Sequence, residues 1–343
     1  MSLHGDLGPL LHRISGAITG GRIHNLSTEG ARNLFEMMLA GQGTDAQVAM
    51  ALAAMRVKGA TADELVGAAK AARSRIQFPE LPDRCVVVAT SRQGKRKSPP
   101  MLIAAAAAAS AAGIPVLLQT APSLIGGGVT SGDLWQRLMG SLLGDAAHTE
   151  EMLHEFGLAC WRPTLADPGW QRLQRIEDET GIRGIPDVVT KLMLPEGARV
   201  MTAAVPGPVL GLAGDAFQSL GHSQALIVQG VEGSVDPSVV ESTRGMRLVN
   251  GVKAPLRIRP SDFAFFESCE PQHQHEDPVE AAVVATHQAL LGSAGCETCS
   301  ACLTAALLIS VVEADLDLAT CLSMAIEAME SGAADAKLRA LRA

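Results

Sequence analysis

Apolar residues in the first part of the chain recur three and four positions apart, which is the spacing of one face of a helix. Two such stripes are Leu34, Met37, Met38 and Val48, Ala51, Leu52, Met55. Helix starts are marked by capping boxes, in which Thr is followed three residues later by Gln or Glu; they are Thr44 with Gln47 and Thr61 with Glu64. Residues 1–78 are therefore predicted to form a compact helical domain. The apolar stripe on this bundle favours a homodimer through its helices.

After residue 82 the pattern changes to short apolar runs separated by helical segments. Residues 85–89 and 116–118 are uncharged runs typical of strands that are buried on both faces. Ser98 and Pro99 are predicted to begin the helix between them, and Gly113 to end it. A strand, a helix and a strand at this spacing form a right-handed βαβ unit.

The same alternation continues toward the end of the chain. Further strands are predicted at residues 200–204 and 225–228, with helices at 210–220, 278–291, 301–313 and 318–331. We therefore predict an α/β protein. It has a small N-terminal helical domain over residues 1–78, joined by part of 165–192, and a larger α/β domain over 79–343 with a mixed or parallel sheet.

Composition and charge narrow the classes of function. The chain has a formal net charge of -8, 3% aromatic residues and no Tyr. A basic coat and a row of aromatic stacking platforms, the usual means of binding single-stranded nucleic acid, are therefore missing. One basic patch on an acidic body can still attract a polyanion, so the local distribution of charge decides.

The start of the chain and its cysteines bear on the compartment. No cationic segment followed by an apolar one stands at the N-terminus, so the seven Cys are expected to be reduced thiols of a cytoplasmic protein. Residues 98–132 carry no charge, but Gly113 and Pro115 interrupt them, and no membrane span is expected.

The loop after the first predicted strand is the main candidate for chemistry. Open α/β sheets bind anions where a strand feeds a loop that opens a helix, because free backbone N–H groups and the helix dipole point there. This loop contains four cations and a flexible glycine in the run Ser91, Arg92, Gly94, Lys95, Arg96, Lys97, Ser98. It predicts a site for a phosphorylated small molecule or a nucleic-acid backbone. The alternative is a solvated charged loop without a ligand.

A second glycine-containing loop follows the second predicted strand. Gly126, Gly127 and Gly128 precede Thr130, which is expected to cap a helix with Asp133 at its third position. This run is interpreted either as a second anion-binding loop or as a plain mobile loop, and its residues do not decide between the two.

A set of Cys and His residues near the C-terminus is the other candidate site: Cys269, His273, His275, Cys296, Cys299 and Cys302. Thiolates and imidazoles suit zinc or an iron–sulfur cluster. The last three Cys are expected on one helix, three residues apart, where they spread over its surface and converge poorly on one ion. Ordinary core residues are the favoured interpretation, and metal binding stays open.

The order of all these features resembles the anthranilate phosphoribosyltransferase family, glycosyltransferase family 3, over nearly the whole chain. The stretches that carry the resemblance are residues 26–31, 41–47, 55–59, 181–183, 220–222, 230–233 and 325–334. The resemblance implies the fold that this family shares with pyrimidine nucleoside phosphorylases, transfer of a pentosyl or phosphoribosyl group, and Mg²⁺ as cofactor. The family's Asp-Glu metal pair matches Val235 and Asp236, which leaves Asp236 and Glu232 as the candidate metal ligands.

The sequence departs from the family pattern at the segments that bind pyrophosphate and substrate in family enzymes. The family's Gly-Thr-Gly-Gly-Asp-Gly loop, which holds pyrophosphate, is replaced by Ala-Thr-Ser-Arg-Gln-Gly at residues 89–94. Its Lys-His-Gly-Asn segment is replaced by Leu-Gln-Thr-Ala at residues 118–121, and the Arg that would meet anthranilate aligns with Glu177. A glutamate would repel the carboxylate of anthranilate, so anthranilate is not expected to be the substrate.

Residues 91–97, 190–192 and 231–233 are more similar to a divergent branch typified by the YbiB proteins, which bind DNA and RNA. Two functions therefore stay open. The first is an anthranilate phosphoribosyltransferase-like protein that binds a phosphorylated ribose or another polyanion and, if active, transfers a pentosyl or phosphoribosyl group. The second is a non-enzymatic binder of single-stranded nucleic acid that has kept the fold. No catalytic residue is assigned.

Overall fold

The computed structural model describes residues 7–15, 23–205, 209–263, 267–292 and 294–342. In these residues one mixed sheet of seven strands runs in the order β3-β2-β1-β4-β5-β6-β7. The strands are β1 (Val86–Ala89), β2 (Val116–Gln119), β3 (Leu158–Trp161), β4 (Arg199–Ala203), β5 (Gln224–Gln229), β6 (Thr243–Val249) and β7 (Val252–Ile258). Strands β1 to β5 are parallel, and β6 and β7 extend the sheet in antiparallel pairing.

Strand β1 lies at the centre of the parallel part, where Val86 is paired with both Val116 and Arg199. The chain runs outward from β1 through β2 to β3, then returns to the other side of β1 and continues through β4 to β5. The loops at the carboxyl ends of β1 and β4 therefore part in opposite directions. This opens the crevice in which such sheets bind ligands, and the loop of residues 90–98 begins there.

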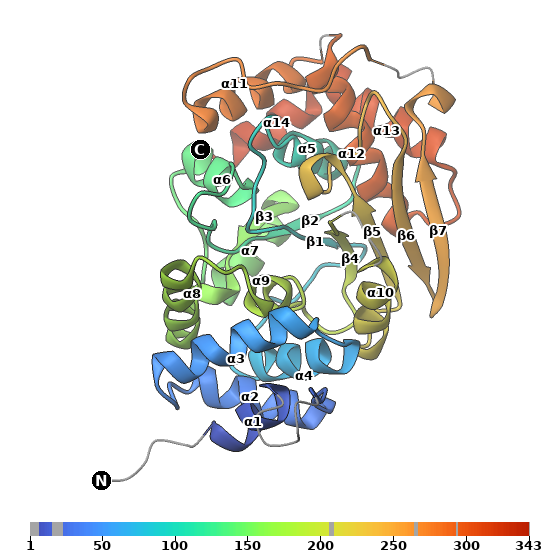
Figure 1. Cartoon of the computed structure of the whole chain (residues 1–343). Helices are drawn as coiled ribbons and strands as arrows, with labels where there is room; N and C mark the ends of the chain where they lie inside the picture. The colour runs from blue at the N-terminus through green and yellow to red at the C-terminus, as the bar shows by residue number, and fades with distance from the viewer. Residues whose placement is uncertain (1–6, 16–22, 206–208, 264–266, 293, 343) are drawn as a thin grey trace.

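Helices cover both faces of the sheet (Figure 1). Side chains alternate along β1, so that Val86 and Val88 face one hydrophobic cluster and Val87 and Ala89 face the other. The first cluster is closed by α5 (Leu102–Ala111), α6 (Ser131–Met139), α11 (Pro278–Leu290), α12 (Cys296–Val312), α13 (Leu318–Glu330) and α14 (Ala333–Ala340). The second is closed by α1 (Gly8–Ser15), α2 (Thr28–Leu39), α3 (Asp45–Lys58), α4 (Ala62–Arg73), α7 (Ala146–Phe156), α8 (Pro168–Thr180), α9 (Ile185–Thr190) and α10 (Val209–Ser219).

The N-terminal helices share the second core with α8 and α9. Trp170 and Leu173 of α8 and Val189 of α9 belong to the same buried cluster as Leu34 of α2 and Met55 of α3. This cluster also contains one face of β1, so the helical part and the sheet are joined by a continuous apolar core. The proposed domain boundary at residue 78 stays a prediction.

Most predicted elements form where the sequence pattern placed them, including both N-terminal capping boxes. The predicted start of α5 at Ser98 was wrong. This helix begins at Leu102, with Met101 in the cap position and no side-chain cap. Ser98 and Pro99 each precede a proline, which disfavours helical backbone at both positions. The Ser98 hydroxyl donates instead to the carboxylate of Glu232.

Three strands were not predicted from the sequence pattern. Strand β3 has only four residues, and β6 and β7 are partly exposed with charged residues and a proline among the apolar ones. Short or irregularly buried runs of this kind lack a clear period-2 signal. None of the helices in the described part of the chain is both long and apolar enough to cross a membrane.

Candidate functional site

The loops that follow β1 and β2 form one structure at the crevice. Lys95 and Val129 exchange two backbone hydrogen bonds with N–O distances of 2.9 Å. Gly94 has a φ of +65°, and a Cβ there would lie 2.2 Å from the carbonyl oxygen of Gly128. Glycine is therefore required where these two backbones approach each other. Thr130 follows this contact and caps α6, as predicted.

Two of the loop's four cations are buried and paired. The guanidinium of Arg92 forms an ion pair with Glu177 of α8, and its Nε donates to the carbonyl oxygen of Pro122 at 2.8 Å. Nζ of Lys95 lies 2.9 Å from Oδ2 of Asp236. Burial raises the pKa of the Glu177 carboxyl, and the charge of Arg92 opposes that effect. Both cations are thus neutralised inside the protein and hold its elements together.

The other two cations face solvent. Arg96 and Lys97 are exposed, and the guanidinium of Arg96 donates to the carbonyl oxygen of Gly126 in the second loop. Neither side chain makes an ion pair with any carboxylate of the described residues. They are therefore the loop cations that can attract a polyanion.

The backbone of the same segment binds a carboxylate of the protein itself. Glu232, in the turn after β5, accepts hydrogen bonds from the amides of Arg96 at 2.8 Å, Lys97 at 3.1 Å and Ser98 at 3.0 Å. Burial acts to raise the pKa of Glu232, but these hydrogen bonds outweigh it and lower that pKa. Consecutive amides that converge on one carboxylate form an anion-binding site. We call the amides of residues 96–98 the amide cluster.

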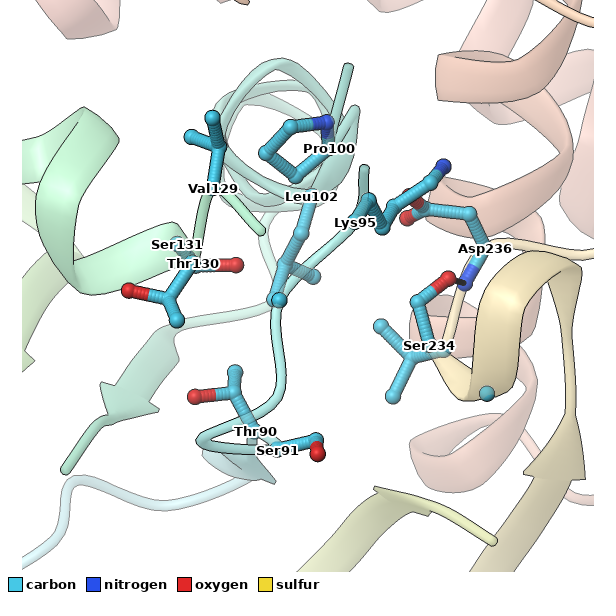
Figure 2. A pocket seen from close by; sticks show the side chains of 13 residues that line it. Thr90, Ser91, Lys95, Pro100, Leu102, Val129, Thr130, Ser131, Ser234 and Asp236 are labelled. Carbon is cyan, nitrogen blue, oxygen red and sulfur yellow. Dashed lines mark hydrogen bonds and ion pairs between the residues drawn. The ribbon is translucent and has the colours of Figure 1, made fainter. Parts of the chain in front are cut away.

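A small cavity lies beside the amide cluster. Figure 2 shows Lys95 pointing toward Asp236 on one side of it and Thr130 and Ser131 on the other. The hydroxyls of Thr90 and Ser91 lie at its lower end in this view. The volume is about 30 Å³, whereas pockets that hold a small molecule usually measure about 300–1,000 Å³. In this arrangement the cavity is closed to a sugar phosphate.

Glu232 and Asp236 do not form a metal site as they stand. Both oxygens of Glu232 accept hydrogen bonds from the amide cluster. Oδ2 of Asp236 is paired with Lys95, and Oδ1 is buried without a hydrogen-bond partner, next to an ammonium group that disfavours a cation. Within the described ranges no group of three or more His, Cys, Asp or Glu is placed to hold a metal ion. Metal binding by these two residues stays a prediction.

Polar groups at the end of β2 are also engaged within the protein. Nε2 of Gln119 donates to the carbonyl oxygen of Thr190 in α9 at 2.5 Å. Arg183 pairs with Asp187 at 2.5 Å and also contacts the side chain of Gln93 in the basic loop. These contacts tie α9 and the segment before it to the loops at the carboxyl edge of the sheet.

The cysteines of the last third lie on or beside α12. Cys296, Cys299 and Cys302 share this helix, as predicted. Sγ of Cys299 donates to Glu267 at 3.1 Å, and burial raises the pKa of the Cys299 and Cys302 thiols to about 12. Cys299 and Cys302 are buried, as core residues are, and metal binding by these cysteines stays a prediction.

Comparison with known proteins agrees with this architecture. Residues 14–76 match the sequence model of the glycosyl transferase family helical bundle domain. An anthranilate phosphoribosyltransferase of Methanothermobacter marburgensis is 30% identical over 250 residues, which is 70% of this chain and 70% of that protein. The chain belongs to the anthranilate phosphoribosyltransferase family. A relative in this family from Anaeromyxobacter dehalogenans strain 2CP-C is 27% identical over 335 residues, 96% of this chain and 97% of the relative.

Solved structures of the family share the fold. The anthranilate phosphoribosyltransferase of Thermus thermophilus superposes with a TM-score of 0.80 at 20% identity, over 96% of this chain and 99% of the other. The Saccharomyces cerevisiae enzyme in complex with PRPP and Mg gives 0.77 at 16% identity, over 97% of both chains. These likenesses confirm the predicted α/β fold with its N-terminal helical domain.

The basic loop is visible in the amino-acid sequence, but the partners of its residues are not. Glu177 and Glu232 lie 85 and 134 residues from the groups that they contact, and nothing in local spacing connects them. Four carboxylates contact the loop, at positions 177, 187, 232 and 236. Only the fold brings them to it.

Proposed function

We propose that this protein binds a ligand carrying a phosphate or pyrophosphate group, in the first place a phosphorylated ribose, at the amide cluster. The observation that carries the proposal is the convergence of three consecutive backbone amides on one carboxylate. They stand beside β1, at the point where the strand order reverses. The S. cerevisiae structure with the same fold is a complex with PRPP and Mg, which supports a ligand of this class.

The chemistry that this arrangement can support is pentosyl or phosphoribosyl transfer. The amide cluster would hold the leaving pyrophosphate by preorganised donors, which need no rearrangement as charge develops on it. Arg96 and Lys97 would add positive charge at the mouth of the crevice. The hydroxyl of Ser131 on the opposite wall would orient the ribose.

Anthranilate is not the acceptor in this proposal. Glu177 occupies the position at which the family resemblance places an Arg for the anthranilate carboxylate. The charge of the neighbouring Arg92 is already neutralised by its ion pair with Glu177. Gln119 is bound to Thr190 and does not reach outward as a substrate ligand. An incoming carboxylate would find no free cation at this position among the described residues, because Arg92, the cation there, is already paired with Glu177.

Calorimetry with PRPP, and separately with ribose 1-phosphate, each at millimolar concentration with Mg²⁺, tests the proposal. Binding is expected, and it should weaken in the variant R96A/K97A. The variant R137A/R339A removes the same charge from two exposed positions on α6 and α14 and is the matched control. The proposal is refuted if neither PRPP nor ribose 1-phosphate binds.

Nucleic acid is the alternative ligand, because the exposed side chains of Arg96 and Lys97 would also attract a phosphodiester backbone. A single-stranded oligonucleotide should then bind with an affinity that falls steeply with salt. Binding of the oligonucleotide together with no binding of PRPP would favour this function over the first.

We also propose a homodimer through the N-terminal helices. Met50 and Val57 lie two turns apart on one face of α3, with 55% and 84% of their surface exposed. Light scattering should give twice the chain mass, and V57D should shift it toward the monomer. The exposed Val252, far away on β7, is the control position for the same substitution.

A further inference from the structure

The amide cluster is filled by an anion that belongs to the protein. The Glu232 carboxylate accepts from three amides and also from the hydroxyl of Ser98, which donates to Oε1 at 2.8 Å. These are the donors that a phosphate oxygen would take. The side chain of Glu232 is only partly buried, so it can leave the cluster toward solvent.

The turn that presents Glu232 has a conformation that L-residues rarely adopt. Glu232 has φ +55° and ψ +25°, in the left-handed region, and it is followed by Gly233 at φ +73°. A non-glycine residue is held there at a cost in free energy and persists only where its surroundings stabilise it. Here the stabilising contacts are the hydrogen bonds of the carboxylate with the amide cluster.

The same turn narrows the cavity beside the cluster. Gly233, Ser234 and Val235 line the cavity, opposite Thr130 and Ser131. A ligand that fills the amide cluster must therefore displace the Glu232 side chain, and the turn of residues 231–233 must move for the cavity to admit a pentose. Glu232 thus occupies the anion site, and the residues that directly follow it line the space next to that site.

We infer that Glu232 is the specificity-determining residue of this site, because it acts as a resident anion that a ligand phosphate must displace. The inference rests on the proposed phosphate-binding function. A carboxylate ligand offers the amides the same group that they already hold, and the held group has the advantage of being intramolecular. A pyrophosphate offers more oxygens and more charge, so the site selects densely charged phosphate ligands over carboxylates and single phosphates.

The test is isothermal titration of the full chain with pyrophosphate as the probe. In E232A the three amides and the Ser98 hydroxyl lose their carboxylate, and pyrophosphate should bind about tenfold tighter than to the wild type, the size expected for one charge-assisted contact. Inorganic phosphate, excluded from the wild type, should now bind as well. E241A, which removes an exposed carboxylate nine positions along the chain, is the control and should leave the affinity unchanged.

The outcomes separate the inference from the proposed function. If wild type and E232A bind pyrophosphate equally, or E232A binds it less tightly, Glu232 is not a competitor and the inference is overturned while the phosphate site stands. If only E232A binds, the inference holds and the phosphate-binding function of the intact protein fails. If neither protein binds, both are refuted.

A second measurement on the wild type covers the case in which E232A folds poorly. Hydrogen exchange should show the turn of residues 231–233 exchanging faster when pyrophosphate is added, while the amides of residues 96–98 stay protected by the new ligand. Unchanged exchange in the turn at a pyrophosphate concentration that saturates the protein would overturn the inference.

Discussion

The basic loop has two halves that look alike in sequence and differ in the folded protein. In the first half Arg92 and Lys95 are 2% and 3% exposed and bound to Glu177 and Asp236. In the second half Arg96 and Lys97 are exposed without an ion pair among the described residues. The number of cations in the loop therefore does not measure its capacity to bind a ligand. Two of the cations are structural, and the ligand-directed part is the backbone together with the remaining two.

The buried half should be the most sensitive to substitution. R92M leaves the Glu177 carboxylate buried without its partner, which should lower the free energy of unfolding by about 3–5 kcal/mol. Urea unfolding followed by tryptophan fluorescence measures this. The double variant R92M/E177L, which removes both charges, should recover most of the loss. Equal losses for R92M and R96M would remove the distinction between the halves.

Gly94, inside the buried half of the loop, should matter next. A Cβ at Gly94 would lie 2.2 Å from the carbonyl oxygen of Gly128, so G94A should destabilise the protein by about 1–3 kcal/mol beyond the cost of its positive φ. G113A is the matched control, since Gly113 has a φ of +86° and no atom within 4 Å of the added carbon. If the two variants have the same unfolding midpoint, the two loops are not in close contact.

Acid should weaken the contact between Glu232 and the second half of the basic loop. The folded protein lowers the pKa of Glu232 below its ordinary 4.5. Its contribution to stability is therefore complete above pH 4.5 and is lost as the pH falls through the folded pKa. The stability of E232Q should fall less over that range than that of the wild type. Parallel pH profiles of the two proteins in urea unfolding would contradict the hydrogen bonding of this carboxylate.

The exposed half should contribute least to stability. R96A/K97A should change the free energy of unfolding by no more than about 0.5 kcal/mol. The same variant should reduce by about two the slope of log affinity against log salt for any polyanion that binds here. A large stability loss with an unchanged salt slope would reverse the roles of the two halves.

Much of the architecture could be predicted from local patterns. The spacing of Val48, Leu52 and Met55 predicted α3, the capping pair at Thr130 predicted α6, and the apolar run at residues 85–89 predicted β1. These features depend on neighbours within a few residues, so they can be predicted from the sequence alone. The start of α5 was mispredicted because Ser98 and Pro99 each precede a proline, which disfavours helical backbone there. The Ser98 side chain also has a partner, Glu232, that lies far away in the chain.

A strand that ends in a basic, glycine-containing loop before a buried helix can be recognised from the amino-acid sequence alone, and it predicts an anion site at that edge of the sheet. Which groups of the loop remain available for a ligand depends on the tertiary structure. Parallel strands bring residues 177, 187, 232 and 236 to the same edge as residues 92–98. Burial then favours ion pairing of Arg92 and Lys95, because an unpaired charge inside the protein costs about 3–5 kcal/mol.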